Sequence, residues 1–164
     1  MTKARCIVVT GGESGIGAAC AIAFGEIGDD VAILFHSDAA GAQAVADKVI
    51  AAGGKAETVQ CDVGDEASVA NAFAAAEAAF GPVSVLVNSA GVNMAGVAVR
   101  DMELAQWNRT IGTDLTGAFL VSRRFLKGCE GPGVMIHISS IHAEAVRAGG
   151  ADYCAAKGGL TRLV

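Results

Sequence analysis

A tyrosine and a lysine late in the sequence have the spacing of a proton-transfer pair. Tyr153 and Lys157 lie four positions apart in a stretch predicted to be helical, so their side chains share one face of the helix. A phenol is a weak base at its ordinary pKa of about 10, and a nearby ammonium favours the phenolate. The pair predicts acid–base chemistry on an oxygen atom, whereas the same spacing without other motifs would indicate a surface pair.

Polar residues upstream of the tyrosine are candidates for the same site. Ser140 lies thirteen positions before Tyr153 and could hydrogen-bond a substrate oxygen. Ser139 is the neighbouring alternative, but the spacing to the tyrosine favours Ser140. His142 follows in the same loop and is a candidate substrate contact. His137 lies within a predicted strand, where we expect a buried, hydrogen-bonded side chain.

A glycine-rich turn, TGGESGIG at residues 10–17, follows the first predicted strand and opens the first predicted helix. Glycines allow backbone amides to approach a pyrophosphate, and the helix N-terminus supplies partial positive charge. Glycines also form ordinary tight turns, so the cluster alone is a weak signal. Its place between a strand and a helix favours a phosphate-binding turn.

The elements that must position these residues alternate between strands and helices. Short apolar runs flanked by glycine or polar residues predict strands buried on both faces. The predicted strands are Cys6–Val9, Val31–Phe35, Thr58–Cys61, Val83–Val87 and Val134–Ile138. Helical patterns follow each of them, the last from Ala151 to Val164. The alternation predicts an α/β fold, a doubly wound parallel sheet with helices on both faces and ligands at the carboxyl ends of the strands.

Four of the predicted helices have apolar residues at helical spacing. The sets are Ile16, Cys20, Phe24 and Ile27 in the first helix, Val45, Val49 and Ala52 in the second, Val69, Phe73 and Phe80 in the third, and Ile111, Leu115, Phe119, Ser122 and Leu126 in the fourth. Side chains at this spacing share one face of a helix, and an apolar face normally packs on the core. We therefore expect each of these faces to pack on the core.

Composition narrows the classes of partner. The chain has 164 residues, which suits one domain covering 1–164. Its formal net charge of −5 and the absence of a basic stripe argue against nucleic acid. The five cysteines are scattered without a CxxC pair, so we expect no disulfide framework, no metal site and a reducing cytoplasm. No apolar stretch is long enough for a membrane span, so we expect a soluble protein with a small-molecule partner.

Four motifs in chain order resemble those of the short-chain dehydrogenase/reductase family. They are TGxxxGIG at residues 10–17, Cys61-Asp62-Val63, Asn88-Ser89-Ala90-Gly91 and the segment 140–157. The resemblance implies a Rossmann-like fold and an NAD(P)-dependent oxidoreductase that moves hydride between the nicotinamide and an alcohol or carbonyl. It also implies that the chain is the N-terminal part of a longer one, with the last strands absent, and that the protein is a homodimer or homotetramer.

The resemblance assigns residues to parts of the cofactor. The implied contacts are Gly11, Gly15, Ile16 and Gly17 for the pyrophosphate, Asp62 and Val63 for the adenine, and Asn88, Ala90 and Gly91 for the ribose and nicotinamide, with Tyr153 and Lys157 completing the site. Asp62 also fits a turn carboxylate, and Asp65 is the better candidate for the following helix cap. Asn88 also fits a residue that ties neighbouring backbone groups.

The choice between NAD and NADP depends on the end of the second strand. An acidic residue there would select NAD, but Phe35 stands at that place. His36 and Ser37 could donate to a 2′-phosphate, whereas Asp38 would repel it and Ser14 stands where many NADP-preferring relatives have a basic residue. The balance leans slightly to NADP, with dual use open and with His36 equally compatible with a solvated turn.

Asp114 departs from the family pattern. The resemblance implies an asparagine there, whose backbone carbonyl helps to hold a water joined to the lysine. The backbone contact would survive the change, but the carboxylate could pair with Lys157 and reduce its effect on Tyr153. We therefore expect an altered pH dependence with the chemistry retained.

The loop after the fifth predicted strand bears on the substrate. Residues 139–144, SSIHAE, are similar to the SSxHE pattern of glucose 1-dehydrogenases in this family, with the glutamate displaced by one position. A sugar or another alcohol is the expected substrate. The alternatives are a carbonyl reductase of the 3-oxoacyl-carrier-protein reductase type and a non-catalytic dinucleotide-binding protein. The intact set of Ser140, Tyr153 and Lys157 argues against the second alternative.

Overall fold

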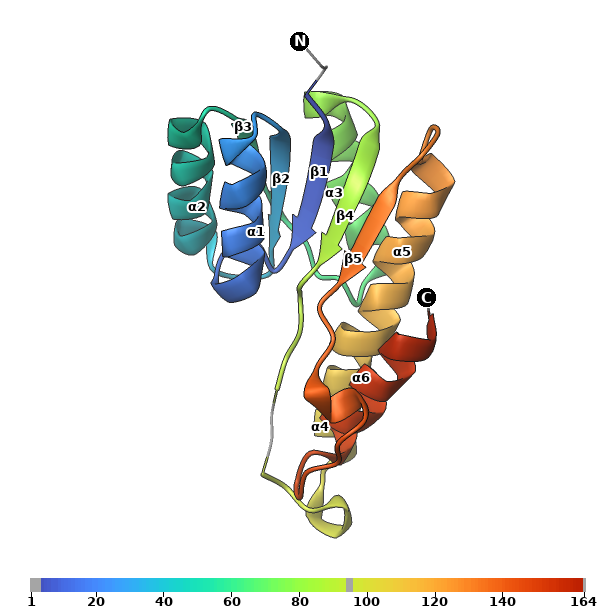
Figure 1. Cartoon of the computed structure of the whole chain (residues 1–164). Helices are drawn as coiled ribbons and strands as arrows, with labels where there is room; N and C mark the ends of the chain where they lie inside the picture. Colours follow the sequence, from blue (N-terminus) through green and yellow to red (C-terminus); the bar gives the residue numbers. More distant parts are fainter. Residues whose placement is uncertain (1–3, 94–95, 164) are drawn as a thin grey trace.

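The computed structural model describes residues 4–93 and 96–163, which form one parallel β-sheet with helices on both faces (Figure 1). The strands are β1 (Cys6–Thr10), β2 (Asp30–Phe35), β3 (Lys55–Gln60), β4 (Val83–Asn88) and β5 (Val134–His137). They lie in the order β3-β2-β1-β4-β5. The chain winds outward from β1 in one direction and returns beyond β1 to continue in the other. This confirms the predicted doubly wound fold and sets the switch point between β1 and β4.

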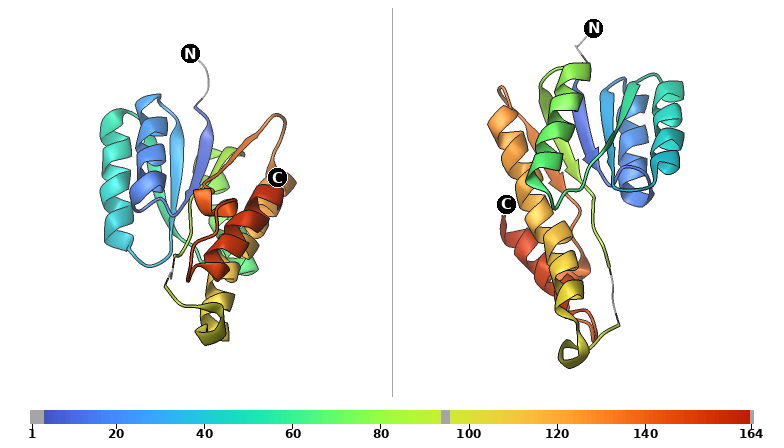
Figure 2. Two further views of the ribbon diagram at one scale, coloured as in Figure 1. Left: turned by 60° about the horizontal axis from the view of Figure 1, so that its bottom comes forward. Right: turned by 180° about the vertical axis from the view of Figure 1, so that it is seen from behind.

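The helices form the two outer layers. On one face lie α1 (Gly15–Glu26) and α2 (Ala39–Ala52), and on the other lie α3 (Glu66–Phe80) and α5 (Gly117–Gly128) (Figure 2). Beyond the carboxyl ends of the strands, α4 (Leu104–Ile111) packs beside α6 (Ala151–Leu163). This second group of helices brings the tyrosine and the lysine to the same end of the sheet as the glycine-rich turn.

The core forms on both faces of the central strands. Along β1, Cys6 and Val8 join the apolar cluster under α3 and α5, whereas Ile7 and Val9 join the cluster under α1 and α2. Successive side chains of a strand point to opposite faces, so a strand covered on both faces is apolar throughout. The prediction of strands buried on both faces is confirmed for β1, β2 and β4.

The same prediction is wrong for the two outer strands. In β3 the exposed side chains include Lys55 and Glu57, and the strand begins three residues earlier than predicted and ends before Cys61. In β5, Val134 is 52% and Ile136 is 41% exposed. Each strand is paired along one side only in the described sheet, and polar alternation is usual where one face of a strand meets solvent.

The predicted face of the first helix packs only in part, since Cys20 and Phe24 contact the core cluster while the two ends of the set do not. Ile16 and Ile27 are 57% and 68% exposed, and α1 instead buries Gly17, Ala21 and Gly25. These small residues let the helix backbone approach its neighbours closely. A Cβ added to Gly25 would lie 3.0 Å from the carbonyl oxygen of Val49 in α2. Close approach rather than apolar bulk therefore determines which face packs.

The predicted fourth helix contains a π-turn, called η2 (Gly112–Thr116), between α4 and α5. A π-turn inserts an extra residue into the helical repeat and rotates the following residues to a new face. The stripe expected to be buried therefore has Phe119 and Leu126 exposed, while Leu120, Val121 and Phe125 pack on the sheet. The π-turn also turns Asp114 into the interior.

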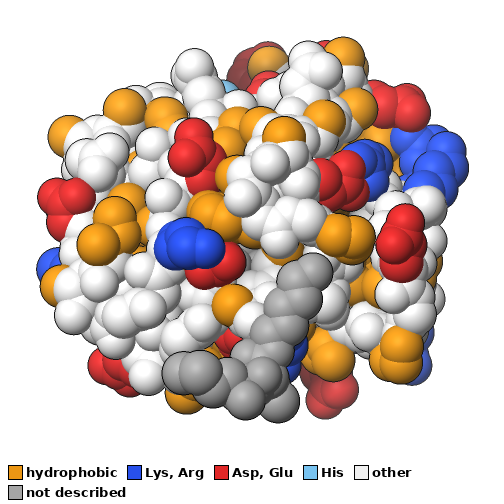
Figure 3. All heavy atoms as spheres, turned by 90° about the horizontal axis from the view of Figure 1, so that it is seen from above, with side chains coloured by type: hydrophobic (Ala, Val, Ile, Leu, Met, Phe, Trp, Pro, Cys, Tyr) orange, Lys and Arg blue, Asp and Glu red, His pale blue; other side chains and the backbone are white. Residues whose placement is uncertain are grey.

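The face at the amino ends of the strands, opposite the site described below, has acidic and basic side chains interspersed with apolar ones (Figure 3). No helix among residues 4–93 and 96–163 is long and apolar enough to cross a membrane. Within the same residues there is no group of three or more histidine, cysteine or acidic side chains placed to hold a metal ion.

Candidate active site

A cleft of about 700 Å³ lies at the carboxyl ends of the strands, at the switch point of the sheet. Its walls come from the glycine-rich turn, the ends of β2 and β4, the segment after β3, the π-turn and α6. The sequence-predicted residues that line it are Gly11, Ser14, Gly15, Ile16, His36, Ser37, Asp62, Val63, Ala90, Gly91, Asp114, Tyr153 and Lys157. The structure thus brings together segments from the whole length of the chain.

The glycines of the turn have different roles. Gly11 has φ 61° and lies so close to the fourth strand's end that an added Cβ would be 2.9 Å from the Ala90 backbone. Gly15 has φ 54° and faces open space at the start of α1. Gly17 does not line the cleft, and its Cβ would lie 2.2 Å from the carbonyl oxygen of Gly11. Gly17 therefore shapes the turn from behind, while Gly11 and Gly15 expose backbone to the cleft.

The carboxyl ends of β1 and β4 are joined by a side chain that sequence reasoning missed. The Thr10 hydroxyl donates to Oδ1 of Asn88 at 2.9 Å and accepts from the amides of Ser89 and Ala90 at 3.2 and 3.1 Å. Asn88 is buried, so in the structure it ties the backbone of the switch point rather than lining the cleft. A threonine directly before the glycine motif was the available signal.

His137 continues this network into α5. Its Nδ1 accepts from the side-chain Nδ2 of Asn88 at 3.2 Å, and its Nε2 donates to Ser122 Oγ at 3.3 Å. Ser122 in turn donates to the carbonyl oxygen of Ala118 at 2.6 Å. Burial and the positive charge of Lys157 lower the pKa of His137, which keeps the ring neutral. The expectation of a hydrogen-bonded histidine is confirmed, but the side chain is half-buried rather than fully buried.

Tyr153 and Lys157 lie together at the cleft wall on α6. The Lys157 ammonium is 5.6 Å from the centre of the Tyr153 ring and donates to the carbonyl oxygen of Ile138 at 3.1 Å. Lys157 is buried, which keeps its charge from being screened by solvent. The ring and the ammonium therefore have the relation that the helical spacing predicts.

Asp114 is the counter-charge of this lysine. Its Oδ2 lies 3.4 Å from the Lys157 nitrogen, and its Oδ1 accepts from the Val92 amide at 2.7 Å. Burial raises the pKa of Asp114, although the Val92 amide and Lys157 act in the opposite direction. The pairing expected from the sequence is present, and it places a carboxylate in contact with the lysine of the tyrosine–lysine pair.

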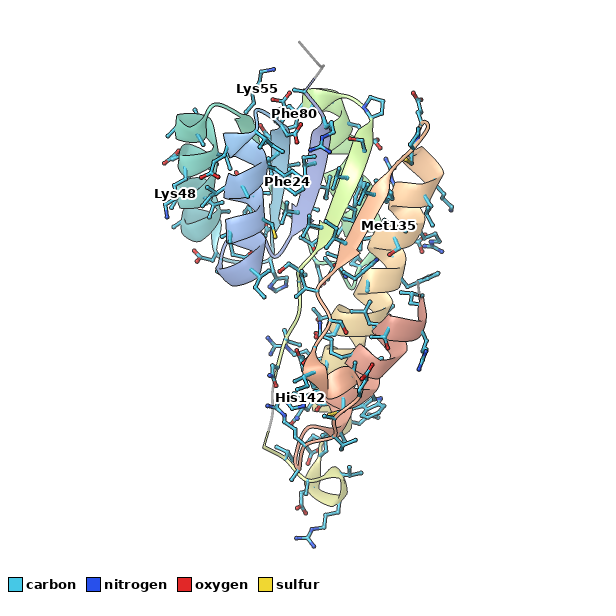
Figure 4. The ribbon with its side chains drawn as sticks, in the orientation of Figure 1. Phe24, Lys48, Lys55, Phe80, Met135 and His142 are labelled. Carbon is cyan, nitrogen blue, oxygen red and sulfur yellow. The ribbon has the colours of Figure 1, made fainter. Side chains whose placement is uncertain are left out.

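The loop after β5 contains the other predicted residues. Ser140 precedes the short helix η3 (Ile141–Ala143), and its Oγ accepts from the His142 amide at 3.2 Å. Ser139, the alternative, is among the residues that line the cleft, whereas Ser140 is not. His142 lies beside α6 (Figure 4), with its ring 6.3 Å from the Tyr153 ring in an edge-on arrangement. The assignment of the substrate-binding serine to Ser140 stays a prediction.

Asp152 anchors the tyrosine and was not identified from the sequence. Its carboxylate is fully buried and accepts from the Thr110 hydroxyl at 2.9 Å, the Gln106 amide nitrogen at 3.2 Å and the Tyr153 amide at 2.8 Å. Burial on its own raises the pKa of Asp152, but these hydrogen bonds outweigh it and lower the pKa overall. The carboxylate is therefore ionised at neutral pH and ties the start of α6 to α4.

The other end of the cleft carries acidic groups. Asp38 begins α2, where Oδ1 accepts from the Gly41 amide at 2.9 Å, so its carboxylate acts as a helix cap. Glu13 lines the cleft, and its Oε2 is buried without a hydrogen-bond partner in the described part of the chain. Asp62 accepts from the Gly64 amide, while Asp65 caps α3, as predicted. Glu13 was not considered from the sequence, although it stands inside the glycine motif.

Comparison with known proteins assigns the family. A model of the family described as short chain dehydrogenase matches residues 5–164. The chain is 38% identical to the 3beta-hydroxysteroid dehydrogenase 1 of Eggerthella lenta over 98% of this chain and 62% of that protein. It is 33% identical to glucose 1-dehydrogenase 2 of Bacillus subtilis over 97% of this chain and 63% of that protein. The chain belongs to the short-chain dehydrogenase family.

A solved structure agrees with this assignment. A short-chain dehydrogenase/reductase from Serratia marcescens superposes with a TM-score of 0.92 at 34% identity, over 97% of this chain and 65% of that one. The chain therefore spans less than two thirds of the length of these three relatives. Family members bind nicotinamide dinucleotides and act on small molecules, and the cleft lies where such a ligand binds in a doubly wound sheet.

Proposed function

We propose that this protein is an NAD(P)-dependent oxidoreductase that interconverts an alcohol and a carbonyl compound. The observation that carries the proposal is the arrangement of Tyr153 and Lys157 on the wall of the same cleft as the glycine-rich turn. The residues fit the cofactor, because Gly11, Gly15 and Gly91 expose backbone where side chains would narrow the cleft. The nicotinamide supplies the acceptor or donor of hydride.

Proton transfer is the task of the tyrosine. In alcohol oxidation the phenolate of Tyr153 takes the hydroxyl proton as hydride leaves the carbinol carbon, and in reduction the phenol returns a proton to the carbonyl oxygen. The Lys157 ammonium stabilises the phenolate through the short separation from the ring. Ser140, or Ser139 on the cleft wall, would hydrogen-bond the substrate oxygen.

The residues around Tyr153 bear on the class of substrate. The intact tyrosine and lysine favour an enzyme over a non-catalytic binder, since a binding module has no need of a proton-transfer pair. The predicted substrate contact His142 lies 6.3 Å from the Tyr153 ring but does not line the cleft, and its Nδ1 contacts the Ala145 carbonyl oxygen. A hydroxyl-bearing substrate, a sugar or another secondary alcohol, is therefore proposed from the tyrosine–lysine pair. The relatives' names, hydroxysteroid and glucose dehydrogenases, refer to substrates of this kind.

The test is a spectrophotometric assay with NAD or NADP and a panel of sugars and secondary alcohols. Turnover that depends on Tyr153 supports the proposal. Tight cofactor binding without turnover of any alcohol, or of the matching ketone in reduction, contradicts the catalytic part. Failure to bind either dinucleotide contradicts the whole assignment.

Glu13 favours NAD, against the slight lean to NADP that His36 and Ser37 gave. Glu13 lines the cleft, and its buried Oε2 has no hydrogen-bond partner in the described residues, so at the adenosine end it would accept from a ribose hydroxyl and repel a 2′-phosphate. We expect the protein to bind NAD more tightly than NADP. Glu13→Gln should tighten NADP binding about tenfold while changing NAD binding little, since like charges a few ångströms apart repel by roughly 1–4 kcal/mol.

Calorimetric titration with both dinucleotides measures this preference. Glu26→Gln is the matched control, because Glu26 is an exposed carboxylate at the far end of α1. Tighter NADP than NAD binding by the unmodified protein would contradict the role given to Glu13.

Asp114→Asn should shift the pH dependence of alcohol oxidation. The ionised carboxylate offsets the charge of Lys157, so its removal leaves more net positive charge beside the Tyr153 ring and should move the half-maximal rate to lower pH. Initial rates across a pH series measure the shift. An unchanged profile would refute a role for the carboxylate in proton transfer.

The same variant should be more stable than the unmodified protein at neutral pH, by about 1–2 kcal/mol. Because burial raises the pKa of Asp114, the folded protein binds more protons than the unfolded chain above the ordinary carboxyl pKa, and stability falls as pH rises through that window. Urea unfolding should therefore separate the two proteins at neutral pH and not below the ordinary carboxyl pKa. An equal difference at both pH values would contradict this cause.

An exposed apolar surface on α5 bears on the oligomeric state. The exposed Phe119 and Leu126 on α5, with Met135 and Leu163 beside them, line an apolar hollow. This supports the homodimer or homotetramer implied by the resemblance, and sedimentation measures the oligomeric state.

All five cysteines are free, which supports a reducing compartment such as the cytoplasm.

A further inference from the structure

Arg147 places a second cation beside the proposed proton-transfer residue. Its guanidinium carbon lies 5.8 Å from the centre of the Tyr153 ring, and its Nη2 donates to Oδ1 of Asn93. Both partners line the cleft. Arg147 is not itself among the residues that line the cleft, but its guanidinium contacts two side chains of the cleft wall, at the end where Tyr153 would meet its substrate.

This arginine has no counter-charge within residues 4–93 and 96–163. Arg147 lies in the segment between η3 and α6, whereas the two half-buried arginines of α5 pair with carboxylates of α3, Arg123 with Glu66 and Arg124 with Glu77. Arg147 makes no such ion pair in the described part of the chain, and its buried Nε has no hydrogen-bond partner there. A guanidinium offers five donors in a planar fork, so most of this capacity is unused.

The two buried carboxylates at this end of the cleft already have partners. Asp114 pairs with Lys157 and the Val92 amide, and Asp152 holds α6 to α4 through Thr110 and Gln106. Neither has an ion-pair contact with Arg147. The positive charge at this end of the cleft is therefore left for an external anion.

We propose that Arg147 binds a carboxylate of the substrate, and that the substrate is a hydroxy acid or the corresponding oxo acid. This inference rests on the proposed function. The planar guanidinium of an arginine can bind a carboxylate through two parallel hydrogen bonds. Because Arg147 lies over the Tyr153 ring, a carboxylate bound to it would be separated from the reacting hydroxyl of the substrate by a short carbon chain. The carbinol C–H bond loses hydride to the nicotinamide and the hydroxyl proton goes to Tyr153, while the carboxylate takes no part in bond changes.

Matched substrates separate this role from general effects on the tyrosine. The probes are 3-hydroxybutyrate and its methyl ester, which share the reacting hydroxyl and differ in charge. Arg147→Met should lower kcat/KM about 10- to 100-fold for the acid, mostly through KM, and leave the ester within about threefold. Arg147→Lys should restore part of the loss for the acid, because it returns the charge without the fork.

Arg100→Met is the matched control. Arg100 is exposed and, among the described residues, forms an ion pair only with its neighbour Asp101 in the short helix η1 (Val99–Asp101), so both substrates should react as in the unmodified protein. Equal losses for acid and ester in Arg147→Met would assign Arg147 to packing against the ring and overturn the proposal. An unmodified protein that prefers the ester would also overturn it.

A binding measurement separates this inference from the proposed function. Calorimetry of 3-hydroxybutyrate with the Tyr153→Phe protein and the reduced or oxidised dinucleotide needs no turnover. Binding that Arg147→Met abolishes supports the anion site even if no substrate reacts. Binding that is indifferent to Arg147 overturns the anion site even if the oxidoreductase activity is established.

Discussion

Tyr153→Phe should reduce alcohol oxidation about 10²- to 10⁴-fold, the range expected when a general acid–base group is removed. The variant loses one oxygen atom and keeps the ring. The contacts of Tyr153 with His142, Arg147 and Lys157 all involve the ring, so the phenylalanine of the variant can retain them. The loss should therefore fall on the chemical step and not on folding or cofactor binding.

Initial rates with the best alcohol of the panel, together with dinucleotide titration, measure both effects. The chain has a single tyrosine, so no other phenol can substitute for Tyr153. Thermal unfolding of the variant serves as the control and should match that of the unmodified protein. A rate within about threefold of the original would show that another group moves the proton.

Gly17→Ala should destabilise the protein by about 3 kcal/mol and abolish cofactor binding. The added methyl carbon would lie 2.2 Å from the carbonyl oxygen of Gly11, so either the turn or the start of α1 must move. Movement of Gly11 also disturbs its close approach to Ala90. One methyl group should thus disrupt both the glycine-rich turn and the junction between β1 and β4.

Gly112→Ala is the matched control for this substitution. Gly112 has helical φ −58°, and an added Cβ would meet nothing within 4 Å. Its stability should stay within about 1 kcal/mol of the original, or improve, because alanine is the better helix former. Chemical denaturation and dinucleotide titration measure both variants. Normal cofactor binding by Gly17→Ala would contradict the turn geometry.

The broad architecture was predictable because the strands and helices alternate regularly. In a parallel sheet every carboxyl end lies at the same edge, so motifs that follow different strands must meet. Residues as distant in sequence as Gly11, Asp62 and Tyr153 line one cleft for this reason. The residues proposed to bind the cofactor and to transfer the proton could thus be grouped before their geometry was known.

The predictions of helix burial that were wrong depend on contacts that the sequence pattern does not reveal. The face that α1 buries is chosen by close backbone approach at Gly17 and Gly25, not by its larger apolar side chains. The π-turn changes the helical phase, which reversed the expected burial of Phe119 and turned Asp114 inward. A uniform period of 3.6 residues cannot reveal such an insertion.

The polar groups that were missed are recognisable only through their partners. Asp152 is buried among hydrogen-bond donors from α4, which lies more than forty positions earlier in the chain. Glu13 and Arg147 stand out because each is partly buried without an ionic partner in the described residues. Spacing along the chain gives no indication of either condition.

Transfer of isotope tests the central claim most directly. A secondary alcohol deuterated at the carbinol carbon is incubated with the protein and the oxidised dinucleotide, and the nicotinamide is analysed by mass spectrometry. We predict deuterium in the nicotinamide of the unmodified protein and almost none with Tyr153→Phe, although both bind the dinucleotide. A dinucleotide that binds the unmodified protein but gains no deuterium, or gains it equally with Tyr153→Phe, would contradict hydride transfer assisted by this tyrosine.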